Sequence, residues 1–290
     1  MARRRASLAE IRGFYARQMA MSSKSSDPRL ERVFELVPRE AFMPPPPWKI
    51  RLLFAEQYVE TPSDDPIYLY QNTLVALDAE RHINNGEPFL HARWIGAVAP
   101  QPGESVTHIG AGTGYYSAIL SLLALPGGTL TAFEIDEELA GMARRNLAPF
   151  ENVTVTGGNA VSLPLPPSDL IYVNASVVAP PAQWLAALRL GGRMIFPWHP
   201  SPAIAGAVIV TRAEQGFAFK GLMPAWFIAC VGASDAAECE RVPDRADVGR
   251  TKSVHLRQDR TPDESATAVY KDVWFSAEPV EGGAGAARAV

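Results

Sequence analysis

Three glycines at alternate positions, within the run His108–Tyr116, are the residues of this chain best suited to holding a small ligand. Gly110, Gly112 and Gly114 permit a tight turn, and without side chains they leave backbone amides open to a bound molecule. The third glycine follows the second too closely for the G-x-G-x-x-G pattern that seats the pyrophosphate of NAD or FAD. The G-x-G-x-G spacing favours a ligand that has no pyrophosphate.

A carboxylate at Glu134 adds to this signal, because it ends the next predicted strand after the glycine run. A carboxylate in that place can accept hydrogen bonds from the two hydroxyls of a ribose. Glycine-rich turns also join strands to helices for structural reasons alone, so a purely structural loop is the alternative. Together the two features favour a nucleoside ligand.

Alternating helices and strands are predicted around these residues from about position 89 onward. The predicted helices cover 89–98, 117–125, 139–147 and 183–190, and the predicted strands cover 105–109, 129–135, 153–155, 169–173 and 193–196. Gly191 and Gly192 are expected to form a turn, and 207–210 with 217–219 a closing hairpin. The alternation is typical of βαβ crossovers, so we expect an α/β fold with a doubly wound, mainly parallel sheet.

Three regions are expected along the chain. Residues 1–98 would form an N-terminal cap, helical to about residue 60 and then loop with short extended pieces. Residues 99–232 would form the ligand-binding core. Residues 233–290 would form a C-terminal extension with a partly disordered tail, because apolar clusters thin out there.

Proline and aromatic residues suggest further details. The four prolines at 44–47 are expected to be a stiff connector, with a partner-binding polyproline segment as the alternative. The apolar patch 273–275 is expected to dock on the domain, and residues 281–290 to be disordered. Five tryptophans are expected to lie in the core: Trp94, Trp184, Trp198, Trp226 and Trp274.

Composition excludes several classes of protein. The 290 residues are 47% apolar and 20% charged with a formal net charge of -4, which rules out a chain disordered throughout. The mildly acidic balance argues against a nucleic-acid binder, and no apolar run approaches the roughly 18 residues of a membrane-spanning helix. The basic run Arg3–Arg5 is not followed by an apolar stretch, so no secretory signal is expected.

Cysteine and histidine usage narrows the chemistry. The two cysteines, Cys230 and Cys239, cannot form a disulfide framework or a zinc site built from thiolates, so a cytoplasmic location is expected. The five histidines lack metal-ligand spacing and no H-E-x-x-H motif occurs, so no metal is expected.

Three further segments give the chain a family resemblance over roughly residues 10–232. Val37–Phe42 is similar to a V-P-R-x-x-F motif, Leu188–Pro197 to L-K-P-G-G-R-L-I-x-P, and Leu222–Phe227 to L-x-P-V-x-F. With the glycine run and Glu134, the chain resembles the protein-L-isoaspartate (D-aspartate) O-methyltransferase family. The resemblance implies a Rossmann-like methyltransferase fold, S-adenosylmethionine as cofactor and S-adenosylhomocysteine as product.

The resemblance also implies which residues hold the cofactor. Gly110, Ala111 and Gly112 would line its methionine part and Glu134 its ribose. Asn159 would lie near the adenine, where the family usually has an aspartate in a G-D-G motif, and an amide can still bond a purine edge. The full expected set is Ile109, Gly110, Ala111, Gly112, Gly114, Tyr115, Glu134, Ile135, Asn159 and Ala160.

The chain departs from the family pattern T-I-S-x-P-H-M-H-A at the segment 84–92. Gly86 stands where the family has the serine that lies beside the methyl acceptor. The segment is therefore either a cofactor-covering turn without that contact, or a turn in which Asn84 or Asn85 orients a different acceptor. Provided that Gly86 needs no positive φ, replacing it by serine is expected to raise methylation of an isoaspartyl peptide.

Two more residues complete the expected acceptor site. His91 matches the second histidine of the pattern, although a lone histidine in a first helical turn is more often a core or capping residue. Asn174 follows a buried strand, at the sheet edge where ligands bind in such folds. The expected catalytic set is Asn84, Asn85, Gly86, His91 and Asn174.

The expected reaction is methylation of a carboxylate on a peptide or protein. An ionised carboxylate needs no general base, so orientation and exclusion of water would suffice. For a phenol or an amine, His91 or Glu87 would be the candidate base. The alternatives are a methyltransferase with a small-molecule or dedicated peptide acceptor, and a cofactor-binding protein without catalysis.

Overall fold

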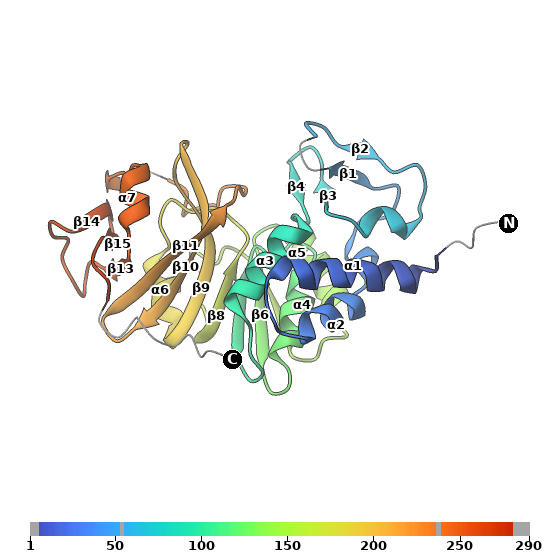
Figure 1. Cartoon of the computed structure of the whole chain (residues 1–290), viewed down its shortest axis with the longest axis horizontal. Coiled ribbons are helices and arrows are strands. Elements are labelled where there is room, and N and C mark those ends of the chain that lie inside the picture. The colour runs from blue at the N-terminus through green and yellow to red at the C-terminus, as the bar shows by residue number, and fades with distance from the viewer. Residues whose placement is uncertain (1–5, 53–54, 236–238, 281–290) are drawn as a thin grey trace. The chain divides into compact units, whose positions relative to one another are not determined.

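The structure, a computed structural model, describes residues 6–52, 55–235 and 239–280 (Figure 1). The chain divides into two compact units. The first unit combines residues 1–104 with 111–158, and the second combines 105–110 with 159–290. The segment 105–110 thus belongs to a different unit from the residues before and after it.

The first unit contains three helices from segments predicted to be helical: α1 (Leu8–Ser23), α2 (Arg29–Leu36) and α3 (Pro88–Val98). Helix α1 begins at a capping box, in which the Glu10 amide donates to Ser7 Oγ at 3.3 Å and the Ser7 amide donates to Glu10 Oε2 at 2.8 Å. The helical apolar spacing that predicted α1 buries Tyr15 and Met19 completely.

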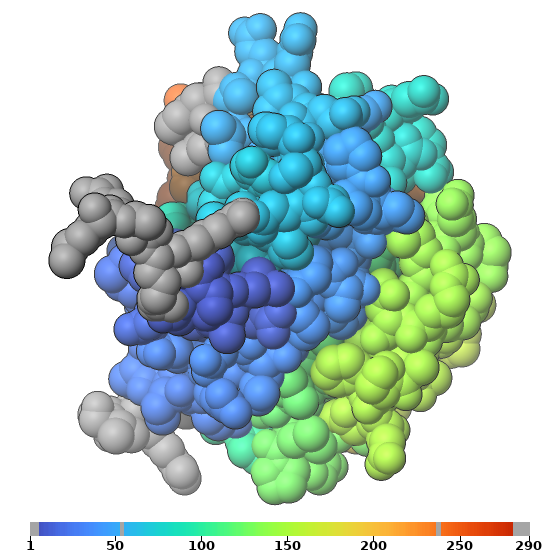
Figure 2. Space-filling model, turned by 90° about the vertical axis from the view of Figure 1, so that its right-hand side faces the viewer, coloured from blue at the N-terminus to red at the C-terminus, as the bar shows by residue number. Residues whose placement is uncertain are grey.

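The first unit also holds an antiparallel sheet, of which the sequence predicts only short extended pieces after residue 60. Its strands lie in the order β2-β1-β3-β4, with bounds Lys49–Leu52 (β1), Val59–Glu60 (β2), Thr73–Asp78 (β3) and Ile83–Asn84 (β4). Figure 2 shows this part of the chain, in lighter blue and cyan, on one face with the N-terminal helices in blue. The prediction that residues up to about 60 are helical is therefore wrong for β1 and β2.

Prolines explain where the helical part ends. The short 3-10 helix η1 (Arg39–Phe42) precedes the run 44–47, whose prolines lack the amide hydrogens that would continue a helix. The run connects η1 to β1, and Trp48 Nε1 donates to the Pro44 carbonyl at 2.8 Å. A second 3-10 helix, η2 (Pro66–Leu69), lies in the region predicted as loop.

The remaining elements of the first unit follow the prediction closely: α4 (Tyr115–Ala124), β6 (Thr129–Glu134), α5 (Glu137–Leu147) and β7 (Val153–Gly157). Strands β6 and β7 are parallel, with Glu134 opposite Gly157 at their carboxyl ends. Asp136 begins α5 by accepting a hydrogen bond from the Leu139 amide at 3.0 Å. Glu134 consequently lies where the strand has ended and the next helix starts.

The second unit is built on one continuous sheet. Its first strands are β5 (Ser105–Ile109), β8 (Ser168–Val173), β9 (Leu188–Ser201), β10 (Ile204–Ala213) and β11 (Gly216–Pro224). Strand β8 is parallel to both β5 and β9, whereas β10 is antiparallel to β9 and forms the predicted closing hairpin with β11. The α/β class is confirmed, with parallel pairing of β5 with β8, of β8 with β9 and of β6 with β7.

One predicted boundary is wrong in this sheet. The helix expected over 183–190 is α6 (Ala182–Ala187), and β9 begins directly at Leu188. Ser168 pairs with Leu188 while Leu170 pairs with Arg193, so the intervening residues of β9 bulge out of the ladder. The two glycines expected to form a turn lie in this bulge.

The C-terminal extension continues the same sheet beyond β11. It contains β12 (Cys239–Arg241), α7 (Arg245–Arg250), β13 (Ser253–Leu256), β14 (Ala266–Tyr270) and β15 (Val273–Ser276), in the strand order β12-β14-β15-β13-β11. The patch 273–275 docks as predicted, since Phe275 of β15 stacks on Trp198 with ring centroids 4.6 Å apart. The predicted disorder of 281–290 concerns residues outside the described ranges.

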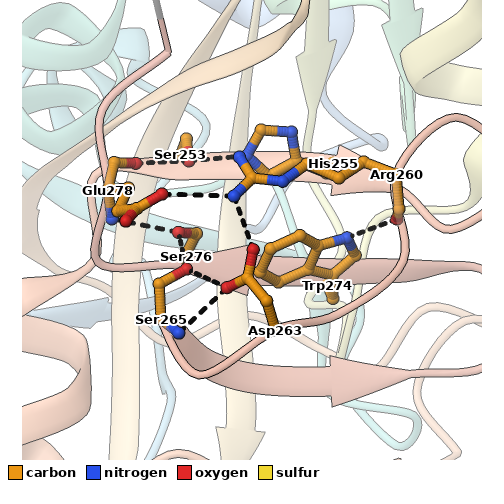
Figure 3. Close-up of polar contacts among 8 residues, drawn as sticks. All are labelled: Ser253, His255, Arg260, Asp263, Ser265, Trp274, Ser276 and Glu278. Carbon is orange, nitrogen blue, oxygen red and sulfur yellow. Dashed lines mark hydrogen bonds and ion pairs between the residues drawn. The ribbon is translucent and has the colours of Figure 1, made fainter.

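A network of polar and aromatic contacts closes the extension (Figure 3). The Arg260 guanidinium lies over the Trp274 ring and forms ion pairs with Asp263 and Glu278 at 2.6 and 3.1 Å. On the neighbouring strand the His255 ring stacks on Trp274, and its Nε2 lies 2.9 Å from Ser253 Oγ. These contacts join β13 and β15 to the segment between β13 and β14 and to the segment after β15.

Four of the five tryptophans expected in the core are buried there, and Trp226 is the exception with 70% of its surface exposed. Trp226 comes just after β11 ends. Among the helices of the described residues, none has both the length and the apolar character to cross a membrane.

Candidate functional site

The glycine run follows β5 and precedes α4, as predicted, and its last glycine has a packing role. Gly114 has φ +96° and its amide donates to the Ala111 carbonyl at 2.9 Å. A Cβ on Gly114 would lie 2.7 Å from Leu147 Cδ1 of α5. Only glycine allows the start of α4 to approach Leu147 of α5 this closely, so Gly114 has a structural role in the packing of the loop.

Glu134 and the loop are joined directly. Glu134 is only 7% exposed, and its Oε2 accepts a hydrogen bond from the Gly112 amide at 2.7 Å. Its Oε1 accepts one from the Asp136 amide at 3.0 Å. Burial raises the pKa of Glu134, while the amides of Asp136 and Gly112 oppose that shift by stabilising the charged form.

This arrangement fits a nucleoside. Two backbone amides hold the Glu134 carboxylate in place, and each of its oxygens keeps a lone pair for a ribose hydroxyl. Ile135, the next residue, is 48% exposed and provides apolar surface beside the carboxylate. Ala111 is buried, and its amide donates to the Phe133 carbonyl at 3.0 Å, which ties the loop to the end of β6.

Tyr115, expected among the cofactor residues, points its side chain into the core. Its hydroxyl lies 3.5 Å from that of Tyr15 in α1, and its ring packs edge-on against Phe42. Only its backbone, at the start of α4, remains for the ligand expected there.

In the second unit, Asn174 lies at the carboxyl end of β8. The backbone amide of Asn174 donates to the Ile109 carbonyl at 2.8 Å. A Cβ added to Gly110 would lie 3.4 Å from the Cβ of Asn174. Its Nδ2 lies 2.9 Å from His108 Nε2. Burial lowers the pKa of His108 to about 3, so the ring is neutral, and in the tautomer protonated at Nδ1 its Nε2 accepts the Asn174 N–H.

This contact leaves Asn174 with an unused acceptor. Within residues 6–52, 55–235 and 239–280, its buried Oδ1 has no hydrogen-bond donor. Buried polar atoms are nearly always bonded, so an unpaired one at the edge of the sheet marks a place for a ligand donor. His108 was missed as a supporting residue, although a polar residue inside a predicted buried strand was a signal for it.

Asn159 and Ala160 also lie in the second unit, and both are engaged in local structure. Asn159 Oδ1 accepts from the Val161 amide at 2.9 Å, and its Nδ2 donates to the Val231 carbonyl at 3.0 Å. The Ala160 carbonyl accepts from Trp184 Nε1 at 3.0 Å. These two bonds use the side-chain oxygen of Asn159 and one of its two amide hydrogens.

The segment 84–91, in the first unit, is shaped by Gly86 and His91. Gly86 has φ +78°, and a Cβ on it would lie 2.3 Å from His91 Nε2. His91 is 1% exposed and stacks on Tyr116 with ring centroids 3.7 Å apart. The condition for restoring a serine at position 86 is therefore not met, and His91 lies in the core.

The asparagines beside Gly86 have structural contacts of their own. Asn84 Oδ1 accepts from the Gly86 amide at 2.9 Å and so closes the turn. Asn85 is buried, and its backbone amide donates to the Val75 carbonyl at 2.9 Å. The Glu87 carboxylate accepts from Asn72 Nδ2 at 2.7 Å. Within the first unit the structure thus brings Asn84, Asn85, Gly86 and His91 together, and separately Gly112 with Glu134.

Histidine, cysteine and carboxylate side chains form no metal-binding group of three or more in the part of the chain that the structure describes. The strand, glycine loop and helix, followed by a buried carboxylate that the loop amide holds, are typical of nucleoside-binding proteins of the α/β class.

Comparison with known proteins identifies the family. The model of the protein-L-isoaspartate(D-aspartate) O-methyltransferase family matches residues 53–235, well over half of the chain. The chain belongs to this family.

Individual relatives agree with this. The chain is 29% identical over 163 residues to the protein-L-isoaspartate O-methyltransferase of Ignicoccus hospitalis, covering 55% of this chain and 76% of that protein. It is 37% identical over 134 residues to that of Aeropyrum pernix, covering 44% of this chain and 51% of that protein. It therefore spans about half the length of some curated relatives and three quarters of others.

Solved structures share the fold. A protein-L-isoaspartate O-methyltransferase superposes with a TM-score of 0.64 at 19% identity, covering 92% of this chain and 87% of the other. A Plasmodium falciparum protein described as a putative member, in complex with S-adenosyl-L-homocysteine, has a TM-score of 0.60 at 16% identity, covering 76% and 97%.

Proposed function

We propose that this chain transfers a methyl group from S-adenosylmethionine to a side-chain carboxylate of a peptide or protein. The substrate named for its family, an isoaspartyl residue, is the first candidate. The observation that carries the proposal is the Glu134 carboxylate, held by the Gly112 and Asp136 amides at the end of β6. This is the arrangement that a ribose requires.

The chain's own residues would bind and orient the reactants. Glu134 would accept the ribose hydroxyls, Gly110–Gly112 would leave room for the amino-acid part, and Asn159 would meet the adenine. S-adenosylmethionine supplies a methyl group on a sulfonium, which an ionised carboxylate can accept without a general base. The burial of His91 against Gly86 agrees with a reaction that uses no base.

Asn174 is the proposed acceptor-site residue of the second unit. Its unpaired Oδ1 can accept a hydrogen bond from an N–H of the acceptor. With His108 protonated at Nδ1, its Nε2 holds the Asn174 amide nitrogen, and Oδ1 then faces away from the ring. Asn174 would therefore orient the acceptor and take no part in bond making.

A second candidate is methylation of a different acceptor, either a small molecule or one dedicated peptide. The observation in its favour is the turn at Gly86, where the family's serine hydroxyl is absent and His91 leaves no room for it. A cofactor-binding protein without catalysis is the third.

We also propose the wider setting of this activity. Residues 1–98 would act as a cap, 99–232 as the cofactor-binding core and 233–290 as an extension of its sheet. The two cysteines are free thiols, which supports a cytoplasmic location. Neither nucleic acid nor membrane is proposed as a partner.

A methyl-transfer assay separates the candidates. Tritiated S-adenosylmethionine would be offered with an isoaspartyl peptide, its aspartyl counterpart and a cell extract. The first candidate predicts labelling of the isoaspartyl peptide and not of its aspartyl counterpart. This labelling should be lost in Glu134→Ala and kept in Glu137→Ala, a control at an exposed α5 carboxylate. Labelling of an extract component without the peptide would favour the second. Binding of S-adenosylhomocysteine without labelling of any acceptor would favour the third.

A further inference from the structure

The hairpin of β3 and β4 lies against the glycine loop. Leu77, near the end of β3, places its Cδ1 only 3.3 Å from the position of a Cβ on Gly112. Gly112 is the loop residue whose amide holds Glu134. The hairpin therefore reaches the same backbone that forms the cofactor site.

Arg81, in the turn of this hairpin, forms ion pairs with two aspartates. Arg81 Nη1 lies 2.5 Å from Asp136 Oδ2, and Arg81 Nε lies 2.6 Å from Asp78 Oδ2. Asp78 also accepts from the amides of Glu80 and Arg81 at 3.0 Å each, so the turn that carries the guanidinium has a fixed shape. One arginine thus joins the hairpin to the segment after β6.

The residue at the other end of this ion pair is part of the site. The backbone amide of Asp136 holds Glu134 Oε1, while its side chain caps α5 and meets Arg81. The Leu139 amide and the Arg81 guanidinium both lower the pKa of Asp136, so its carboxylate stays charged at neutral pH. The ion pair lies two residues from the ribose-binding carboxylate.

We propose that the β3–β4 hairpin is a cover over the cofactor site, and that Arg81 is a positioning residue that keeps it closed through Asp136. Leu77 is the apolar contact of this cover with the loop. The inference rests on the proposed function, because it assumes that S-adenosylmethionine and S-adenosylhomocysteine bind at Gly112 and Glu134. Release of the bound nucleoside would then require the ion pair to open.

The test measures how fast S-adenosylhomocysteine leaves the full-length protein. Arg81→Gln removes the ion pair and leaves the cofactor loop unchanged. Arg144→Gln is the matched control, because it removes another exposed ion pair of α5, with Glu137 at 3.0 Å. Exposed ion pairs are weak, so we expect release to be about two- to fivefold faster in Arg81→Gln and unchanged in the control. High salt should speed release from the wild type and leave Arg81→Gln unaffected.

A double variant and hydrogen exchange complete the design. Asp136→Asn keeps a side chain that can cap α5, so adding it to Arg81→Gln should speed release no further. Amides of residues 73–84 should exchange more slowly when S-adenosylhomocysteine is bound, and Arg81→Gln should weaken this protection. Equal release rates in Arg81→Gln and wild type, or no protection of 73–84, would overturn the inference. A wild type that does not bind S-adenosylhomocysteine at all would refute the cofactor assignment itself.

Discussion

Replacing Gly86 by serine tests how far this chain has departed from its family at the acceptor loop. A serine there would restore the hydroxyl of the family pattern. Two features of the structure disfavour a serine here: Gly86 has φ +78°, and a Cβ at this position would lie 2.3 Å from His91 Nε2. The His91 ring cannot easily turn aside, since it stacks on Tyr116 in the core. We therefore expect a less stable protein and no gain in methylation of an isoaspartyl peptide.

The two causes can be measured separately. A left-handed backbone at a residue other than glycine costs about 1–2 kcal/mol, and forcing extra atoms into a packed site costs about 1–3 kcal/mol. Gly191→Ser is the matched control, because Gly191 has φ +76° and no atom within 4 Å of its Cβ position. It should show the backbone cost alone, and Gly86→Ser the sum of about 2–5 kcal/mol. In a His91→Ala background, the destabilisation caused by Gly86→Ser should fall to that caused by Gly191→Ser.

Urea denaturation of these variants gives the free energies of unfolding, and tritium transfer to an isoaspartyl peptide gives the activity. Equal destabilisation by Gly86→Ser and Gly191→Ser would show that His91 does not limit the space at this turn. A several-fold rise in isoaspartyl methylation in Gly86→Ser would refute the reasoning altogether, because it would mean that the turn accepts the family's serine.

The remaining predictions concern the cofactor site and its support. Glu134→Ala should weaken binding of S-adenosylhomocysteine by about 1–3 kcal/mol in calorimetry, through loss of charge-assisted hydrogen bonds, and unchanged affinity would remove Glu134 from the site. Gly112→Val should abolish binding, since its side chain would meet Leu77 and fill the loop. Burial lowers the pKa of His108 from its ordinary value of 6.5 to about 3 in the folded protein, so only the unfolded state gains this proton as the pH falls through 6.5. The free energy of unfolding should thus drop by about 2 kcal/mol between pH 7.5 and 5 because of His108. Urea denaturation across that pH range should show that this drop is absent in His108→Gln. Asn174→Leu should raise KM for the acceptor more than it lowers kcat in steady-state methyl-transfer assays, whereas a fall in kcat at unchanged KM would contradict a role in orienting the acceptor.

The features that the sequence predicts correctly are those whose residues lie close together along the chain. The glycine run, the strand before it and Glu134 after the next strand are close to one another in sequence, so spacing alone located them. The sheet of β1 to β4 was missed because its strands are two to six residues long and pair across prolines and turns. Such pairing is non-local and leaves no periodic pattern to detect.

The structural role of individual side chains is harder to predict from the sequence than their place in the fold. Gly86 was recognised as a departure from the family, but its φ angle and its contact with His91 depend on the folded turn. The importance of Leu77 and Arg81 likewise depends on which backbone the hairpin meets. Asn174 was identified at the sheet edge, and its unpaired oxygen became visible only with the partner of its amide nitrogen.

The C-terminal extension changes how the sheet of the second unit meets solvent. Without β13, Phe217 and Ala218 at the start of β11 would lose their strand partners Val254 and Ser253, and unpaired strand edges template aggregation and intermolecular pairing. With the extension in place, the outermost strand of that end is β12, which has three residues and includes Glu240 and Arg241. A short, charged border of this kind is a common natural safeguard against self-association. The extension therefore ends the sheet on a short, charged strand and not on the longer strand β11.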